Sequence, residues 1–181
     1  MMSPKKTLQR VLQKGLISAL LAASLLLSVT AAAWSQGAAP AIRYPIPDSD
    51  FPISQAVEIP ADGTLVYLSG QVPAVIDETA EENTVAAFGD TEAQTVTVLE
   101  KIEAILTDLE LTMGDVVKMQ AFLVGDPAME WQLDFAGFMA GYTQFFGTEV
   151  QPNLPSRSAM QIAGLVNPGW LVEIEVVAMR E

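Results

Sequence analysis

Arg157 is the only charge in the stretch LPSRSAMQIAGL, which covers residues 154–165. A planar guanidinium can bind a carboxylate through two parallel hydrogen bonds. Sixteen residues later, Glu173 and Glu175 alternate with apolar residues in LVEIEVVAM. These residues admit two interpretations. In the first, Arg157 pairs with Glu173 or Glu175 as an interface salt bridge. In the second, it binds a ligand carboxylate while Glu173 acts as a base that activates water.

The amino-acid composition restricts what such a site can do. The 181-residue chain contains no histidine and no cysteine. Nucleophiles of the Ser-His-Asp and Cys-His kinds are therefore excluded, and so are the usual zinc sites. Acid–base work falls to Asp, Glu, Tyr, Lys or a water molecule held by the backbone.

Residues 1–33 have the pattern of a secretory signal peptide. A basic start is followed by an apolar run from Gly15 and by the small residues Ala31-Ala32-Ala33. We expect cleavage after Ala33 and a periplasmic or secreted mature protein. Retention of the leader as an anchor is the alternative, because the apolar run is nearly long enough to span a bilayer.

The mature chain is strongly acidic. The leader contains four of the nine Lys and Arg residues, so five remain against 22 Asp and Glu, a net charge of −17. Such a charge repels nucleic acid and anionic membrane surfaces, so we expect neither as a partner, and no stable membrane association after cleavage. Residues 34–50 are rich in Pro, Ala and Ser and predict a linker or N-terminal arm, which leaves 51–181 as one domain.

Five strands are expected, at residues 54–60, 64–70, 116–124, 157–163 and 171–179. The first two flank Ala61-Asp62-Gly63 and the last two flank Asn167-Pro168-Gly169, so each pair is predicted to form a hairpin. Residues 74–90 are acidic without a clear period. They predict a solvated loop, because their spacing fits no calcium-binding loop.

Two helices are expected between the strands. The first begins at Thr91, and its apolar residues recur every three or four positions: Val96, Leu99, Ile102, Leu106 and Leu109. The second is predicted to begin with Asp126 as N-cap and Pro127 at N1, and to end at Gly147. Its apolar stripe is Trp131, Phe135, Met139, Tyr142 and Phe146.

The order β-β-α-β-α-β-β predicts an α+β fold, with one sheet and both helices on one face. Alternation in the last two strands places Arg157, Ala159 and Glu173 on the opposite face. That face is too apolar for open water and too charged for a dry core, so we expect a subunit interface there. In a final hairpin that pairs residue 163 with 171, Arg157 lies roughly 13 Å along the strand from Glu173. A site using both then draws them from neighbouring subunits.

Residues 154–178, LPSRSAMQIAGLVNPGWLVEIEVVA, resemble the C-terminal signature of the RidA/YjgF family of enamine/imine deaminases. The resemblance extends over about residues 45–181. Its further matches are PISQAV at 52–57, YLSGQVP at 67–73, GDVVKMQAFL at 114–123 and DFAGFMAGYTQFF at 134–146. With its leader, the chain looks like an exported member of this family.

The resemblance implies a chorismate-mutase-like fold that assembles as a homotrimer, with sites in the clefts between subunits. It implies that Arg157 binds the substrate carboxylate and that Glu173 positions the attacking water. Backbone groups near Gly70 and Ala159 line the cleft in this family, and no metal or organic cofactor is used. The implied reaction is that of a 2-iminobutanoate/2-iminopropanoate deaminase, which converts reactive enamines and imines to 2-keto acids and ammonia.

Two departures from the family pattern make the cleft less polar. Ile53 stands where many members have tyrosine, and Met139 stands where many have asparagine. Both favour a bulkier, more apolar 2-imino acid, although Met139 alternatively belongs only to the core stripe. The second functional hypothesis is a non-catalytic periplasmic trimer that binds carboxylate ligands or client proteins in a chaperone-like role.

Overall fold

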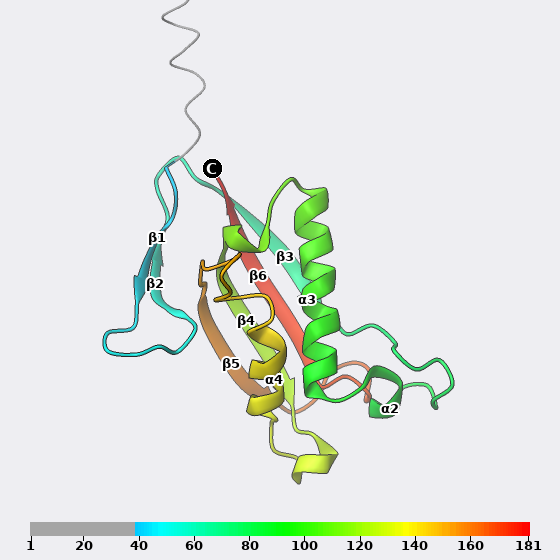
Figure 1. Ribbon diagram of the computed structural model, residues 1–181. Coiled ribbons are helices and arrows are strands. Elements are labelled where there is room, and N and C mark those ends of the chain that lie inside the picture. Colours follow the sequence, from blue (N-terminus) through cyan, green and yellow to red (C-terminus); the bar gives the residue numbers. More distant parts are fainter. Residues whose placement is uncertain (1–38) are drawn as a thin grey trace, which may run out of the picture. The chain divides into compact units, whose positions relative to one another are not determined.

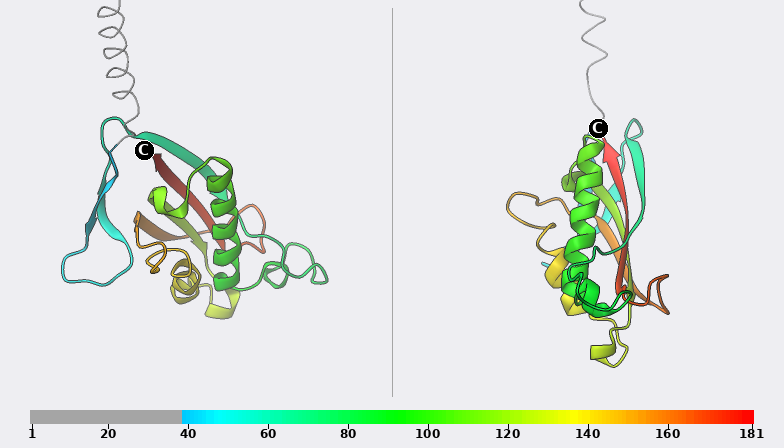
Figure 2. Two further views of the ribbon diagram at one scale, coloured as in Figure 1. Left: turned by 45° about the horizontal axis from the view of Figure 1, so that its top comes forward. Right: turned by 90° about the vertical axis from the view of Figure 1, so that its right-hand side faces the viewer.

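The computed structural model describes residues 39–181, and the predicted signal peptide lies outside them. Six strands form one mixed sheet in the order β1-β2-β5-β4-β6-β3, and α3 and α4 cover one of its faces (Figures 1 and 2). This confirms the predicted α+β fold with a single sheet. No helix within these residues is long and apolar enough to cross a bilayer. The elements are β1 Ile42–Pro45, β2 Ser54–Glu58, β3 Thr64–Gln71, α2 Val85–Phe88, α3 Thr91–Asp108, β4 Val116–Val124, α4 Phe135–Tyr142, β5 Ser156–Ile162 and β6 Val172–Arg180, with short 3-10 helices at Met113–Asp115 and Pro127–Met129.

Strand β4 lies in the middle of the sheet and sets its register. Its predicted alternation is confirmed, because Val117, Met119, Ala121 and Leu123 are buried while Lys118 and Gln120 are partly exposed. It pairs in parallel with β5 and antiparallel with β6. Strand β3 then pairs antiparallel with the far side of β6.

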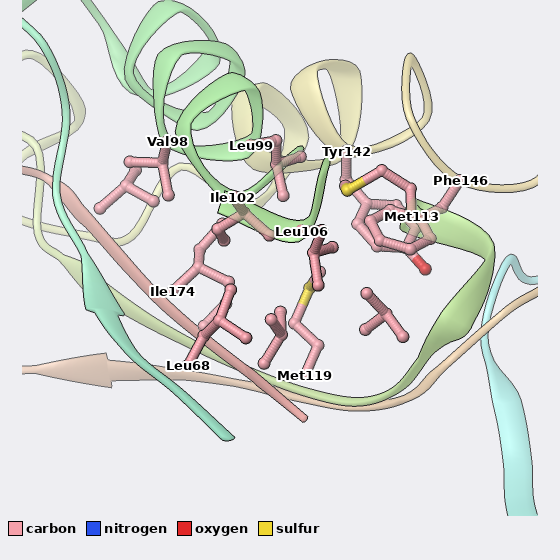
Figure 3. Packing of buried hydrophobic residues seen from close by; sticks show 14 of the residues in the cluster. Leu68, Val98, Leu99, Ile102, Leu106, Met113, Met119, Tyr142, Phe146 and Ile174 are labelled. Carbon is pink, nitrogen blue, oxygen red and sulfur yellow. The ribbon is translucent and has the colours of Figure 1, made fainter. Parts of the chain in front are cut away.

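Helix α3 packs over the sheet and supplies much of the core. Asp90 caps its N-terminus, where the side chain accepts a hydrogen bond from the backbone N–H of Ala93. The predicted stripe is confirmed at Leu99, Ile102 and Leu106, which are fully buried. Figure 3 shows this stripe facing the sheet together with Val98. The first and last residues of the predicted stripe are wrong. Val98 is buried in place of Val96, and Leu109 lies past the end of the helix with 38% of its surface exposed.

The second helix begins later than predicted. Asp126 caps only the short 3-10 helix, because Glu130 and Trp131 both adopt left-handed backbone conformations and stop it. Helix α4 starts after Asp134, whose side chain accepts a hydrogen bond from Gly137 N. Trp131 is therefore 67% exposed, and the buried aromatic residues are Phe138, Tyr142 and Phe146.

The predicted hairpin between residues 54 and 70 is wrong. Strand β2 pairs with β1 on one side and through Ser54 with β5 on the other, whereas β3 pairs with β6. A two-residue turn between paired strands requires positive φ, and neither Asp62 nor Gly63 adopts it. Strand β1 also lies in the segment predicted to be a linker.

The predicted hairpin at the C-terminus is also wrong, because β5 and β6 pair with opposite sides of β4. Asn167 does form the expected turn, since its carbonyl accepts from Trp170 N at 3.1 Å. The connection nevertheless carries the chain across β4, and Leu171 O accepts from Val124 N at 2.8 Å. The register predicted between Gln161 and Glu173 is therefore not formed.

We predict that the two leucines near the end of α3 contribute very differently to stability. Leu106→Ala leaves a cavity under a fully buried side chain and is expected to lower the free energy of unfolding by roughly 2–5 kcal/mol. Leu109→Ala, the matched control at a half-exposed position, is expected to lower it by less than about 1 kcal/mol. Urea denaturation of both variants measures the difference, and equal losses would contradict this packing.

Candidate functional site

Arg157 lies on the helix-covered face of the sheet, opposite to the face predicted for it. In β5 it pairs with Met119 of β4, which pairs in turn with Val176 of β6. Both neighbours are buried under the helices. The prediction failed because it assigned charged residues to the outer face, whereas this guanidinium is covered by aromatic rings.

Three aromatic side chains surround the guanidinium of Arg157. Its Cζ lies 4.2 Å from the ring centre of Tyr142, 5.0 Å from that of Phe138 and 5.5 Å from that of Phe51. Its Nη2 lies 3.2 Å from the sulfur of Met139. Ring faces attract cations, so these side chains hold the charge in place. Of these four side chains, only Met139 was predicted as a site residue. The available sequence signal was the spacing of Phe138 and Tyr142, which places both rings on one face of α4.

The charge of Arg157 has no anionic partner in the part of the chain that the structure describes. Its Nε and Nη1 atoms are buried and have no hydrogen-bond partner. Burial lowers the pKa of Arg157, but arginine remains a cation in proteins. The predicted alternative of a salt bridge with Glu173 or Glu175 is therefore not formed within one chain. A buried cation without a partner is costly, so an anionic ligand would stabilise it.

Glu173 and Gly70 form a second group, on the open face of the sheet. Glu173 pairs with Phe122 of β4, and Phe122 pairs with Met160 of β5. These three residues point to the face opposite to that of Arg157. The carboxylate of Glu173 lies so close to Gly70 that any Cβ at that position would clash with it. The absence of a side chain at Gly70 thus leaves room for the carboxylate, and the structure brings these two predicted site residues together.

The remaining predicted residues lie on the side of Arg157. Ala159 occupies the next position on the same face of β5, in a row with Ala121 and Ile174. Ile53 is partly buried in the segment that runs beside residues 154–156, where Ser54 N donates to Pro155 O at 3.0 Å. The predicted site residues therefore lie in two separate groups, or half-sites, within one chain: Arg157 with Met139, Ile53 and Ala159, and Glu173 with Gly70.

Tyr142 links the guanidinium to the segment that covers it. Its hydroxyl donates a hydrogen bond of 2.9 Å to the carbonyl of Pro52, while its ring lies against Arg157. Burial raises the pKa of Tyr142 to about 12, against a smaller opposing effect of the Arg157 charge. The tyrosine is therefore neutral at any physiological pH and acts here as a hydrogen-bond donor and a ring surface.

Comparison with known proteins gives a consistent result. The sequence profile described as Endoribonuclease L-PSP matches residues 46–180. A RutC family protein of Haemophilus influenzae is 38% identical over 72% of this chain and 88% of its own length. The 2-iminobutanoate/2-iminopropanoate deaminase of Salmonella typhimurium is 33% identical over 71% and 88%. The crystal structure of E. coli TdcF with bound serine superposes with a TM-score of 0.51 at 31% identity, covering 79% of this chain and 99% of that one.

We predict that Tyr142 makes the stability of the protein depend on pH in the alkaline range. Its pKa is raised from 10.0 to about 12, so between these values the unfolded chain loses a proton that the folded chain keeps. The free energy of unfolding therefore falls as pH rises from 10 to 12, by up to roughly 2–3 kcal/mol from this group, and is fully retained below pH 10. Denaturation of the wild-type protein and Tyr142→Phe across this range measures the contribution.

The control for this experiment is Tyr67→Phe, which removes the hydroxyl of a tyrosine that is 73% exposed. That variant is expected to keep the wild-type dependence on pH, whereas Tyr142→Phe is expected to lose the part due to Tyr142. Identical curves for wild type and Tyr142→Phe would contradict the buried, protonated hydroxyl.

Proposed function

The chain belongs to the Endoribonuclease L-PSP family, and on this premise we propose that it hydrolyses 2-imino acids and their enamine precursors to 2-keto acids and ammonia. The observation that carries the proposal is the guanidinium of Arg157, whose Nε and Nη1 atoms are buried without a hydrogen-bond partner within residues 39–181. Such a group suits a substrate with a carboxylate. The relative of Salmonella typhimurium named as a 2-iminobutanoate/2-iminopropanoate deaminase supports the same class of reaction.

The chemistry needs only the residue types that are present. The carbon of an imine is already electrophilic, so water can add to it without a protein nucleophile. Glu173 accepts a proton from that water as its oxygen bonds to the carbon, and then passes this proton to the nitrogen, which received the electron pair of the C=N bond. The proton of the new hydroxyl moves to the nitrogen as the carbonyl forms and the C–N bond breaks, which releases ammonia and restores the carboxylate. Arg157 holds the carboxylate beside this carbon and orients it. We propose no metal and no organic cofactor for these steps.

We further propose that the active protein is a homotrimer whose sites lie between subunits. Arg157 and Glu173 are on opposite faces of the sheet in one chain, and their paired residues in β4, Met119 and Phe122, are three positions apart. One water molecule therefore does not reach both from the same subunit. A site made of Arg157 with Ala159 from one copy and Glu173 with Gly70 from the next removes this difficulty.

The substrate that we propose is bulkier and more apolar than the smallest imino acids. Met139 contacts the guanidinium through its sulfur. Ile53 comes two residues after Phe51, whose ring lies over the guanidinium. The rings of Phe51 and Phe135 stack at 6.4 Å beside this half-site, and each is 39% exposed. An apolar side chain attached to a carboxylate held by Arg157 would gain from contact with these groups.

The cellular setting is part of the same proposal. A signal peptide in residues 1–33 would place the protein in the periplasm or outside the cell, where amino-acid oxidases are one possible source of imino acids. Mass spectrometry of the protein recovered from the periplasm tests this directly, because removal of residues 1–33 leaves a chain that begins at Trp34. A full-length protein held in the membrane fraction would overturn it.

We predict that activity depends on Arg157 and not on positive charge in general. With imino acids generated by an amino-acid oxidase from small and bulky amino acids, the protein is expected to accelerate formation of the keto acid. Arg157→Ala is expected to lower kcat/KM by roughly 10²–10³-fold, the usual loss when a buried charge contact is removed. Arg157→Lys, which cannot form the two-pronged contact, is expected to be intermediate.

The matched control is Arg180→Ala, because Arg180 is an exposed arginine at the end of β6 whose guanidinium only donates to Leu109 O. It should leave kcat/KM near the wild-type value. A protein that binds carboxylates without turnover is the alternative, because the buried Nε and Nη1 of Arg157 could hold a carboxylate without any reaction. Keto-acid binding that requires Arg157, with no acceleration for any imino acid, would establish that alternative.

We predict that two inactive variants restore each other when they assemble together. Arg157→Ala and Glu173→Gln chains are mixed in equal amounts, unfolded and refolded. If each site uses Arg157 and Glu173 from different copies, random assembly gives about one quarter of the wild-type activity. If one copy supplied both residues, no mixed oligomer would contain an intact site, and activity would stay at the level of the separate variants.

A further inference from the structure

A cavity of about 510 Å³ lies outside both half-sites, since neither Arg157 nor Glu173 lines it. The segment before α2, the helix α2 itself and the connection between β5 and β6 line it, and these segments lie side by side in Figure 1. Its volume is in the range of small-molecule sites in proteins. The function proposed above makes no use of it.

Aromatic side chains form the inner wall of the cavity. Phe88, which is 6% exposed, and Trp170 both line it and meet edge to face at 6.2 Å between ring centres. The indole Nε1 of Trp170 is buried without a hydrogen-bond partner within residues 39–181. A buried donor without an acceptor is uncommon.

Hydrogen bonds join the walls to each other, so the cavity is built into the fold. The backbone N–H groups of Ile76 and Asp77 donate to the carbonyl of Ala87 in α2, at 2.8 and 3.2 Å. On the other side, the amide of Asn167 donates to that of Asn83 at 2.6 Å. The acidic segment is thus attached to both α2 and the β5–β6 connection.

The charges around the cavity are all negative. Asp77, Glu78 and Glu82 line it, and no lysine or arginine is among its lining residues. Hydrogen bonds from the side chain and backbone of Thr79 lower the pKa of Asp77, so this carboxylate is ionised at neutral pH. Within the described residues no three acidic side chains are grouped closely enough to hold a metal ion.

We propose that this cavity binds an organic cation, an amine or quaternary ammonium whose body is about the size of one aromatic ring. The rings of Phe88 and Trp170 offer the surface that attracts such a cation, while the three carboxylates supply the complementary charge. This site is independent of the deaminase site and of its chemistry.

The experiment compares choline with 3,3-dimethylbutan-1-ol, which has the same shape and hydroxyl but no charge. Isothermal titration of the exported protein is expected to give saturable binding of choline, and binding of the alcohol that is weaker by at least about tenfold. The variant Asp77→Asn/Glu78→Gln/Glu82→Gln is expected to weaken choline binding by at least about tenfold. Trp170→Leu is expected to weaken it similarly, through loss of the ring surface.

The control variant is Glu103→Gln/Asp108→Asn/Glu110→Gln, which changes the net charge equally at exposed positions that do not line the cavity. It should bind choline like the wild type. Equal weakening in this control would show attraction by net charge alone and overturn the proposal, as would equal binding of the neutral alcohol or no saturable binding of choline. If Trp170→Leu does not fold, the variant with three neutral side chains still decides the question, because those side chains lie at the surface.

Discussion

The pairing of β4 with its two neighbours is the constraint on which the rest of the site depends. Because β4 runs parallel to β5 and antiparallel to β6, each residue from 118 to 123 aligns one residue of β5 with one of β6. Successive residues of a strand point to opposite faces. Met119 therefore brings Arg157 under the helices, and Phe122, three positions on, brings Glu173 to the open face. A shift of β5 by one residue would move Arg157 from the helix-covered face to the open face and leave Glu173 where it is.

The desolvation of Arg157 explains why the aromatic side chains of α4 matter for more than packing. Removing a guanidinium from water is costly unless other groups compensate. The faces of Tyr142, Phe138 and Phe51 compensate in part, but they do not pair with Nε or Nη1. The charge is therefore held in a fixed place while its Nε and Nη1 remain unused. Attraction to a carboxylate is stronger in such surroundings than in water.

Local periodicity predicted the elements well, and pairing between distant segments poorly. The alternation of β4 and the stripe of α3 were readable because burial on one face repeats along the chain. The Asp62-Gly63 turn was misread because its residue types permit a hairpin while the backbone takes negative φ there. The face of β5 was misread because polarity suggests that Met160 lies under the helices and Arg157 on the open face. In the structure the two residues have the opposite positions. No local pattern reveals that a charge will be covered by rings from another element.

The negative charge of the chain affects how Arg157 would select a ligand in the proposed function. Residues 34–181 carry a net charge of −17, which repels anionic molecules that approach from a distance. At physiological ionic strength this repulsion is screened beyond about 8 Å, so it affects the encounter more than the bound state. Selection of a carboxylate must then come from short-range contact with Arg157, and an anion that does not reach the guanidinium gains nothing. The same negative field favours cations at every other surface. In the proposed function, Arg157 therefore discriminates between anions by direct contact, through Nε and Nη1 atoms that have no other partner within residues 39–181.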